Sequence, residues 1–344
     1  MRKKYFIAIF LVVFTMMLSS FAFYTYQIIY TPNVLIEQED RYFAIPRGTT
    51  FKQLQDKLSD ERIVNDLVSF SFLAKLKDLD TNVKNGMYLI KGDMTNMELI
   101  NLLRSGAQTP VKLTFSNARL LKQLPKILTQ NLEIDSAELA PILFADTTAQ
   151  YYGFKKETFV SMFIPNTYEV YWTTRPKELL DRMKAEYDRF WTEERKQKAK
   201  DLNMSKEQVS TLASIVQGET NKMDEAPTIA GVYINRLKRG IPLQADPTLV
   251  FAIGDFSIRR ILNKDKEFES PYNTYKYRGL PPGPISMPSI PAMDAVLNYA
   301  DHNYLYFCAN SDFSGYHVFA KTLVEHNVNA AKFQRALNRE RIYR

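Results

Sequence analysis

The apolar residues of this chain fall into three patterns, and the first is one long hydrophobic run near the N-terminus. Tyr5 to Tyr30 is a stretch of 26 uncharged residues, rich in Phe, Ile, Leu, Val and Met. About 20 such residues are enough to cross a bilayer as a helix, whereas the apolar core of a signal peptide has about 7 to 15. We therefore expect residues 5–30 to be a transmembrane anchor that stays attached to the chain.

The charges that precede this run predict its orientation. Three basic residues come before it, Arg2, Lys3 and Lys4. Basic residues beside a membrane span stay in the cytoplasm, so residues 1–4 are a cytoplasmic tail of a single-pass protein in the cell (inner) membrane. The rest of the chain is then on the periplasmic or extracellular side. A cleaved signal peptide is the alternative, because Ser20, Phe21 and Ala22 loosely fit a cleavage site.

The second pattern, in residues 31–135, consists of short alternating and short periodic segments. Alternation over Arg41–Pro46 and an apolar run at Met87–Ile90 predict two strands. Apolar residues at helical spacing predict two helices, one through Phe51, Leu54 and Leu58 and one through Leu99, Ile100, Leu102 and Leu103, closed by Gly106. The region is therefore predicted to be built from small strand, turn and helix units.

A fainter copy of the first unit follows about 70 residues later. Val111–Phe115 repeats the strand, and Leu121–Leu124 with Leu128 repeats the helix, which indicates internal duplication. The Ile-Pro-x-Gly-x-Thr-like turn that begins at Ile45 resembles that of LysM-type glycan-binding modules, so we predict a LysM-like region. A plain α+β spacer is the alternative, because no aromatic platform or convergent polar set is visible.

Residues 136–200 are predicted to be a helical connecting region. Phe163–Tyr168 interrupts it as a turn, and Pro176–Lys200 is predicted to be one long charged helix with a solvated face. No chemistry is evident in this region.

The third pattern begins near residue 201 and contains the residue with the clearest chemistry, Glu219. Apolar residues recur before it at the spacing of one helix face, at Val209, Leu212, Ala213 and Val216, after a helix start at Ser205. A carboxyl group at the edge of an apolar stripe loses hydration, which raises its pKa and lets it hold a proton near neutral pH, as a general acid must. The alternative is a partly exposed glutamate at a helix end, with Gly218 as a local break.

A second helix follows and is expected to form a hairpin with the first, so that Glu219 lies near the connection. Its signals are Asp224 as the cap, Pro227 in the first turn and Gly240 after the end.

Loops dense in Pro, Gly, Asn and Tyr come next, and stiff loops suit a preorganised binding wall. Asp246 stands before Pro247 as a helix cap often does, so a structural cap and a site residue are both open readings. Tyr272 and Tyr275 are either packed rings or faces for a sugar, whose hydroxyls would suit Asn273 and Thr274.

The chain is predicted to end in a hairpin and a helix. Tyr304–Ala309 and Tyr316–Phe319 read as two strands, and Lys321–Arg335 as the closing helix. His317, on the second strand, is open to a structural role or to a site role.

Composition narrows the function classes. The net charge of +7 comes from 45 basic and 38 acidic residues, and no zinc, helix-turn-helix or RNP pattern accompanies it, so no nucleic-acid partner is expected. The single Cys308 rules out an intramolecular disulfide framework, and three histidines at irregular spacing do not predict a metal site. Without phosphate-binding or dinucleotide motifs, phosphoryl and hydride transfer are not expected, and neither is a cofactor.

Seven ordered motifs together resemble the YceG-like endolytic murein transglycosylases. They are Ala213–Thr220, Gly231–Leu237, Leu243–Thr248, Pro271–Tyr275, Gly279–Ile285, Tyr304–Phe307, and His317–Phe319 with Glu325–Asn327. The resemblance implies an anchor, a LysM-like region and a mixed α+β catalytic domain at 201–344, an α+β chain overall. Gln217 stands where many members carry another Glu, and Asn117-Ala118 replaces an acidic-Gly turn.

The resemblance also implies an activity and partners. The family cleaves peptidoglycan glycan strands near the synthesis machinery, so peptidoglycan and its synthases are the candidate partners, and the catalytic glutamate corresponds to Glu219. Glu219 would protonate the glycosidic oxygen and then take the proton of the muramic acid C6 hydroxyl, which leaves a 1,6-anhydro end. Gln244, Asp246, Tyr272, Asn273, Thr274, Tyr275 and His317 are the candidate substrate-binding residues.

Two other classes stay open on the sequence. A noncatalytic wall-binding scaffold would need no acid at position 219. A glycoside hydrolase would pair Glu219 with Asp246 and leave reducing ends.

Overall fold

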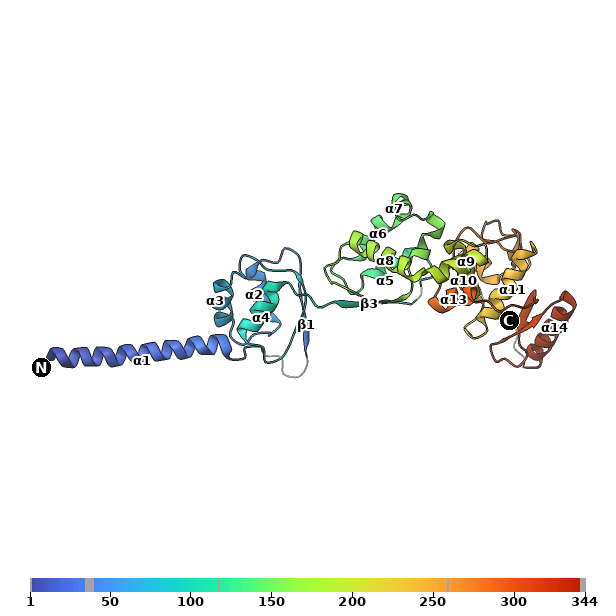
Figure 1. Cartoon of the computed structure of the whole chain (residues 1–344). Helices are drawn as coiled ribbons and strands as arrows, with labels where there is room; N and C mark the ends of the chain where they lie inside the picture. Colours follow the sequence, from blue (N-terminus) through green and yellow to red (C-terminus); the bar gives the residue numbers. More distant parts are fainter. Residues whose placement is uncertain (1, 35–39, 117, 259, 341–344) are drawn as a thin grey trace. The chain divides into compact units, whose positions relative to one another are not determined.

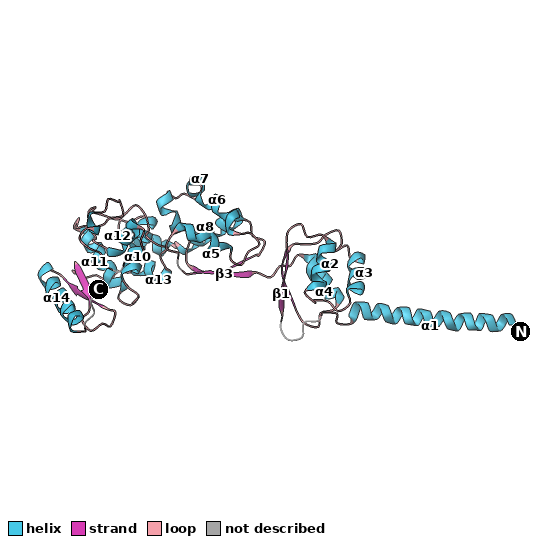
Figure 2. Cartoon of the chain, turned by 180° about the vertical axis from the view of Figure 1, so that it is seen from behind, coloured by secondary structure: helices cyan, strands magenta, loops and turns pink. Residues whose placement is uncertain are grey.

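The computed structural model of the chain describes residues 2–34, 40–116, 118–258 and 260–340, which form many helices and a few short strands (Figures 1 and 2). They divide into two compact units. Unit 1 comprises Met1–Leu113, Asn131–Ile134 and Glu169–Thr174, and unit 2 comprises Thr114–Gln130, Asp135–Tyr168 and Arg175–Arg344. The named strands of the described residues form three two-stranded sheets. The mixed α+β class is therefore confirmed.

Unit 1 begins with the predicted apolar helix. Its elements are α1 (Arg2–Tyr30), β1 (Arg41–Ile45), α2 (Phe51–Asp60), α3 (Leu67–Leu76), β2 (Gly86–Ile90) and α4 (Asn96–Ser105). In α1, the stretch from Lys3 to Tyr30 is long and apolar enough to cross a membrane. The two predicted strands and helices α2 and α4 are confirmed, but α3 was not predicted.

Local sequence signals explain where the helices of unit 1 begin and end. Thr50 and Gln53 form a capping box at the start of α2, and Thr95 and Glu98 form another at the start of α4. Gly106 ends α4 with a φ of 71°, a conformation that costs glycine little. The strands pair antiparallel, with Phe43 opposite Tyr88, and both rings are buried in the core.

The internal duplication predicted from the sequence is only partly reproduced in the structure. The second copy begins with β3 (Val111–Phe115), η1 (Leu121–Gln123) and α5 (Leu124–Thr129), as the repeat predicts. β3 pairs with β4 (Asn166–Val170). The turn predicted at Phe163–Tyr168 is therefore wrong in its second half, because pairing with β3 places Asn166–Tyr168 in a strand, whereas residues 163–165 are a loop. Asn117 lies outside the described residues, and the LysM-like assignment stays a prediction.

Unit 2 contains the remaining elements. Before the motif-rich part these are α6 (Ser136–Phe144), α7 (Asp146–Tyr151), η2 (Lys156–Met162), α8 (Pro176–Phe190) and α9 (Glu193–Asp201). The single helix predicted for 176–200 is wrong, because the helix is interrupted at Trp191, whose side chain is buried. The Thr192 side chain then caps α9 by accepting a hydrogen bond from the backbone amide of Arg195. The predicted limits at residues 30, 135 and 200 describe functional domains and stay predictions.

The motif-rich part of unit 2 packs around one helix. Its elements are α10 (Lys206–Glu219), α11 (Ala226–Lys238), α12 (Asp246–Ile253), η3 (Asp265–Glu267), α13 (Ile290–Leu297), β5 (Tyr306–Ala309), β6 (His317–Ala320) and α14 (Leu323–Arg339). Helix α10 contacts α11, α12, α13 and η2. Every residue from Val209 to Val216 is buried, so α10 is enclosed on all sides and not only along the predicted stripe. The expected hairpin of β5 and β6 is confirmed.

Candidate active site

Helix α10 ends at Glu219, and its start is encoded as predicted. The Ser205 side chain accepts from the Gln208 amide, and the Gln208 side chain accepts from the Ser205 amide, which completes a capping box. Buried polar groups inside the helix are satisfied, since the Ser214 hydroxyl accepts from the Ile285 amide and donates to the Thr211 carbonyl. A rigid, enclosed helix therefore holds the carboxyl group of Glu219 at its C-terminal end.

Among the described residues, the Glu219 carboxyl group has one hydrogen-bond partner, the hydroxyl of Tyr233 on α11. This hydroxyl donates to Glu219 Oε1 at 2.5 Å, and the Tyr233 side chain is almost completely buried. Burial raises the pKa of Tyr233, so the phenol stays protonated and can act as the donor. In the sequence, Tyr233 stands out only as part of the Gly231–Leu237 motif.

The environment raises the pKa of Glu219 to about 7. Loss of hydration is the main cause, the negative charge of Asp246 adds to it, and the hydrogen bond from Tyr233 opposes it. The carboxyl group can therefore be either protonated or ionised near neutral pH, which is the property expected of a general acid that later acts as a base.

This pKa predicts a pH-dependent stability. In the unfolded chain the carboxyl group has its ordinary pKa of 4.5, so below that pH it is protonated in both states and does not disfavour folding. Above pH 7 the folded state must hold a desolvated charge. We expect Glu219→Gln to raise the free energy of unfolding by up to about 3 kcal/mol at about pH 8 and by little near pH 4. Denaturant unfolding at the two pH values checks this, and an equal gain at both would contradict it.

Asp246 is brought to the same place by α12. It is the first residue of that helix, and Ala245 occupies the cap position, so the structural-cap reading is wrong. Its carboxylate instead accepts a hydrogen bond from the Tyr275 hydroxyl. Burial and this bond raise the pKa of Tyr275, which keeps it a donor.

Two cavities meet at Glu219 and Asp246, because both residues line both of them. One cavity, of about 530 Å³, is also lined by Arg119, Val250, Phe251 and Phe256. The other, of about 380 Å³, is also lined by Arg236, Gln244, Lys266 and Tyr275. A chain-like ligand can therefore occupy space on either side of the carboxyl pair.

Cations and aromatic rings lie together in each cavity. The Arg119 guanidinium is 4.7 Å from the centre of the Phe256 ring, and the Lys266 ammonium is 5.1 Å from that of Tyr275. The Arg236 guanidinium donates to the side-chain oxygen of Gln244. The backbone N–H of Gln244 donates to the Thr274 carbonyl. Gln244 therefore lies in the cavity wall, and its sugar contact stays a prediction.

The other predicted binding residues lie behind the cavities. Asn273 is fully buried and donates to the Lys266 and Phe268 carbonyls. The Thr274 hydroxyl bonds to Thr248 and accepts from the Ala245 amide. The Tyr272 ring packs at a tilt against that of Phe251, with ring centres 4.8 Å apart. None of Tyr272, Asn273 and Thr274 lines either cavity, so they hold the loops in shape, and a sugar contact for them stays a prediction.

His317 belongs to a hydrogen-bond network that reaches Thr220, the residue after Glu219. Its Nδ1 lies 2.7 Å from Glu225 Oε1, which also accepts from the Thr220 hydroxyl at 2.7 Å. Glu225 therefore ties the residue after Glu219 to strand β6. The predicted Asp224 cap is wrong, because Glu225 occupies the cap position and the Asp224 carboxylate accepts from the Tyr316 hydroxyl.

Gly218 sets the spacing between α10 and α12. A Cβ atom there would lie 2.8 Å from Cβ and 3.0 Å from Cγ of Pro247, which directly follows Asp246. We expect Gly218→Ala to lower the free energy of unfolding by roughly 1–3 kcal/mol, because Pro247 must move to make room for the added methyl group. The loss should be smaller in a Pro247→Gly background. Equal losses in the two backgrounds, measured by denaturant unfolding, would rule out this contact as the cause.

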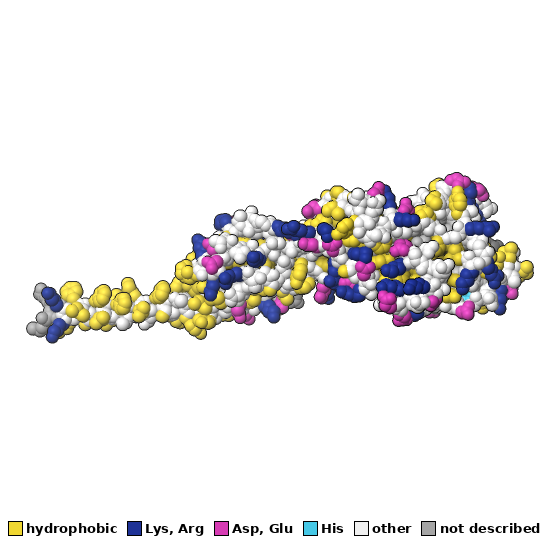
Figure 3. Space-filling view, turned by 45° about the horizontal axis from the view of Figure 1, so that its top comes forward, with side chains coloured by type: hydrophobic (Ala, Val, Ile, Leu, Met, Phe, Trp, Pro, Cys, Tyr) yellow, Lys and Arg dark blue, Asp and Glu magenta, His cyan; other side chains and the backbone are white. Residues whose placement is uncertain are grey.

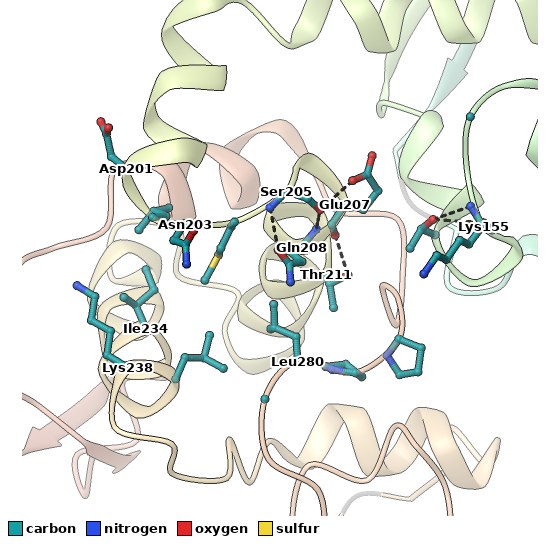
Figure 4. Close-up of a pocket in the computed structure, with 18 residues that line it drawn as sticks. Lys155, Asp201, Asn203, Ser205, Glu207, Gln208, Thr211, Ile234, Lys238 and Leu280 are labelled. Atoms are coloured by element: carbon teal, nitrogen blue, oxygen red, sulfur yellow. Dashed lines mark hydrogen bonds between the residues drawn. The ribbon is translucent and has the colours of Figure 1, made fainter.

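A third cavity, of about 900 Å³, lies at the other end of α10 (Figure 4). Its lining includes Lys155, Ser205, Gln208, Lys238 and Leu280. It shares no lining residue with the two cavities at Glu219. The polar groups of Ser205 and Gln208 are hydrogen-bonded to each other in the capping box. The candidate catalytic group is therefore Glu219 and not a residue of this third cavity.

Sequence reasoning missed four residues of the site region. They are Arg119, Tyr233, Glu225 and Arg236. Tyr233 and Arg236 stand three apart on α11 and so share a face, which was a usable signal. No local pattern marks Arg119, which reaches the site from a segment about 100 residues before Glu219.

Comparisons with known proteins agree on one family. The sequence profile of the YceG-like family matches residues 43–332. A protein of Bacillus subtilis named endolytic murein transglycosylase is 29% identical over 304 residues, covering 84% of this chain and 83% of that protein. One of Streptococcus pneumoniae with the same name is 28% identical over 370 residues, covering 96% of this chain and 65% of the longer relative.

A solved structure also matches the fold. The crystal structure of a YceG-like protein from Listeria monocytogenes aligns with a TM-score of 0.57 at 27% identity, covering 85% of this chain and 99% of that one.

Proposed function

Because the chain belongs to the YceG-like family, we propose that it is an endolytic murein transglycosylase that cleaves glycan strands of peptidoglycan. The relatives that carry this name support the substrate class. The observation that carries the proposal is Glu219, whose pKa of about 7 lets one carboxyl group both give and take a proton.

The proposed reaction needs only this one acid. The Glu219 carboxyl group protonates the glycosidic oxygen as the bond from that oxygen to muramoyl C1 breaks. The resulting carboxylate then accepts the proton of the C6 hydroxyl while the C6 oxygen bonds to C1. The products are a 1,6-anhydromuramoyl end and a free hydroxyl on the departing sugar. Because the attacking hydroxyl belongs to the same sugar, the second step has a high effective concentration.

Three features of the site suit an internal cut in a polymer. The cavities on both sides of Glu219 give room for sugars before and after the broken bond. The hydrogen bond from Tyr233 holds the Glu219 carboxyl group in one orientation. Arg119 and Lys266, one in each cavity, are placed to meet the carboxylates of muramic acid lactyl groups or of peptide stems.

We further propose that α1 anchors the protein in the membrane with the catalytic part outside. The apolar stretch from Lys3 to Tyr30 has the required length, and the basic N-terminal residues favour this orientation. The reaction would then shorten nascent strands close to the membrane and end their elongation, with peptidoglycan synthases as candidate partners.

A two-carboxylate hydrolase is the second candidate, and the position of Asp246 favours it. Asp246 lines both cavities together with Glu219, so it is placed where it could activate a water molecule. Such an enzyme would leave reducing ends in place of anhydro ends.

The experiment that separates these functions is mass spectrometry of glycan strands after incubation with the full chain in detergent. Anhydromuramoyl ends at internal positions of the strand support the proposal. Reducing ends would move the assignment to the hydrolase, and no cleavage with intact strand binding would leave a noncatalytic scaffold.

A further inference from the structure

Helix α3 of unit 1 exposes a stripe of large apolar side chains. Val68, Phe72 and Leu76 are four residues apart and are 75%, 58% and 63% exposed, so they lie along one side of the helix. The opposite side is in the core, where Phe70, Leu73 and Ala74 are buried. Soluble domains rarely expose such a row without a binding partner. We refer to Val68, Phe72 and Leu76 as the α3 stripe.

The end of α1 lies directly against this helix. α1 contacts both α3 and α4, and Ile28 in its last turn is buried in the core of unit 1. The Asn96 side chain donates to the Ile28 carbonyl and to the Ser69 hydroxyl of α3, which ties the three helices together. Figures 1 and 2 show α3 at the end of unit 1 from which α1 extends. Figure 3 shows hydrophobic side chains continuing from α1 onto that end of the unit.

The length of α1 gives the height of α3 above the hydrocarbon. If the span begins after Lys4, about 20 residues bring the helix across the bilayer core near Tyr24. The turns that follow rise 1.5 Å per residue, so Ile28 lies about 6 Å above the hydrocarbon core, within the roughly 5–8 Å of one headgroup layer. The exposed rings of Tyr24, Tyr26 and Tyr30 suit this interface. The part of α1 that α3 contacts is therefore at the depth where interfacial helices lie.

We propose that the α3 stripe is inserted into the outer surface of the membrane beside α1, so that unit 1 rests on the lipid. The inference rests on the proposed anchoring by α1 and is independent of the proposed reaction. Lys75, the single charged residue of α3, is exposed next to the stripe, where it suits an anionic headgroup. Because α1 already attaches the unit to the membrane, insertion of the short stripe is an intramolecular event, and three side chains suffice.

Depth-dependent fluorescence quenching tests the proposal on the full chain in lipid nanodiscs. In a Cys308→Ser background, an environment-sensitive dye is attached to Phe72→Cys, and the nanodiscs carry spin-labelled phosphatidylcholine with the nitroxide near the headgroup. The matched control is Tyr42→Cys, since Tyr42 is 56% exposed and lies in β1, at the end of unit 1 away from α1 (Figures 1 and 2). We expect quenching at position 72 to exceed that at position 42 by about twofold or more, with a blue-shifted emission.

Each other result overturns the proposal in a distinguishable way. Equal quenching at the two positions means that the stripe faces water or, in the cell, another protein. A third label at Phe14→Cys, read in nanodiscs whose nitroxide lies at the end of the acyl chain, reports insertion of α1, because Phe14 is near the middle of the apolar stretch. If position 14 is quenched and position 72 is not, the anchor stands and the α3 proposal falls, and if neither is quenched, the anchoring itself is wrong. Glycan cleavage by the same samples reports the proposed reaction separately.

Discussion

Glu219→Gln is expected to lower the rate of glycan cleavage by about 10³-fold or more, because general acid and base catalysis each contribute about 10²- to 10⁴-fold and one residue would supply both. Glutamine keeps the size of the side chain and can still accept from Tyr233, so the loss reports the missing proton and not a changed fold. The measurement is the initial rate at which anhydromuramoyl ends appear, at a pH near 6 where the wild-type acid is protonated.

Glu207→Gln is the matched control, since Glu207 lies in the same helix and its carboxylate also accepts from a tyrosine, Tyr187. This variant should cleave at the wild-type rate. Should Glu219→Gln still produce anhydro ends at a rate within about tenfold of the wild type, Glu219 is not the acid. Should it bind strands, lose cleavage and yet keep full activity in cells, the scaffold function would be the relevant one.

Tyr233→Phe is expected to move the pH profile of catalysis to higher pH. The acid form of Glu219 is populated below its pKa of about 7, so kcat/KM should be level at lower pH and fall tenfold per pH unit above it. The hydrogen bond from Tyr233 lowers this pKa, so loss of the bond raises the pKa. The falling limb of the plot of kcat/KM against pH then begins at a higher pH. At the same time the Glu219 carboxyl group loses its orienting contact, which we expect to lower kcat by about tenfold or more.

A structural role alone would lower the rate without moving the limb, so the pH profile is the decisive measurement. Tyr187→Phe is the control, because Tyr187 is also buried and also donates to a glutamate of α10, Glu207. Its removal should leave the limb in place. A limb at the same pH in Tyr233→Phe and the wild type would show that Tyr233 does not tune the acid.

The candidate acid was predictable from sequence because its determinants are local. The capping box at Ser205 and the apolar spacing through Val216 define helix α10 within one short window. That window also predicts desolvation at Glu219, and the raised pKa follows from it. The hairpin of α10 with α11 follows from the short connection between them in the same way.

The partners of the acid were not predictable, because they come from elements far apart in sequence. Asp246 could be interpreted as a helix cap, since Asp before Pro is common at helix starts. Only the packing of α12 shows that its carboxylate accepts a hydrogen bond from Tyr275. Asn273 and Thr274 have polar side chains in a loop, yet their atoms are used inside the protein. Residue type alone does not distinguish a group that binds a ligand from one that holds a loop.

Helix α3 was missed for a related reason. Its ten residues are apolar on the buried side and on the exposed side, so no amphipathic period marks it. The same absence of a polar face is what leads to the proposal that one side is covered by lipid.

The sequence by itself determined the apolar helix α1, the start and end of α10 and the acid that ends it, because capping, spacing and hydropathy act over a few neighbouring residues. Only the tertiary structure decided that Tyr233 bonds to this acid, that Asp246 joins it between two cavities, and that β3 pairs with β4. These depend on which surfaces pack together, and packing is set by shape and burial across the whole unit.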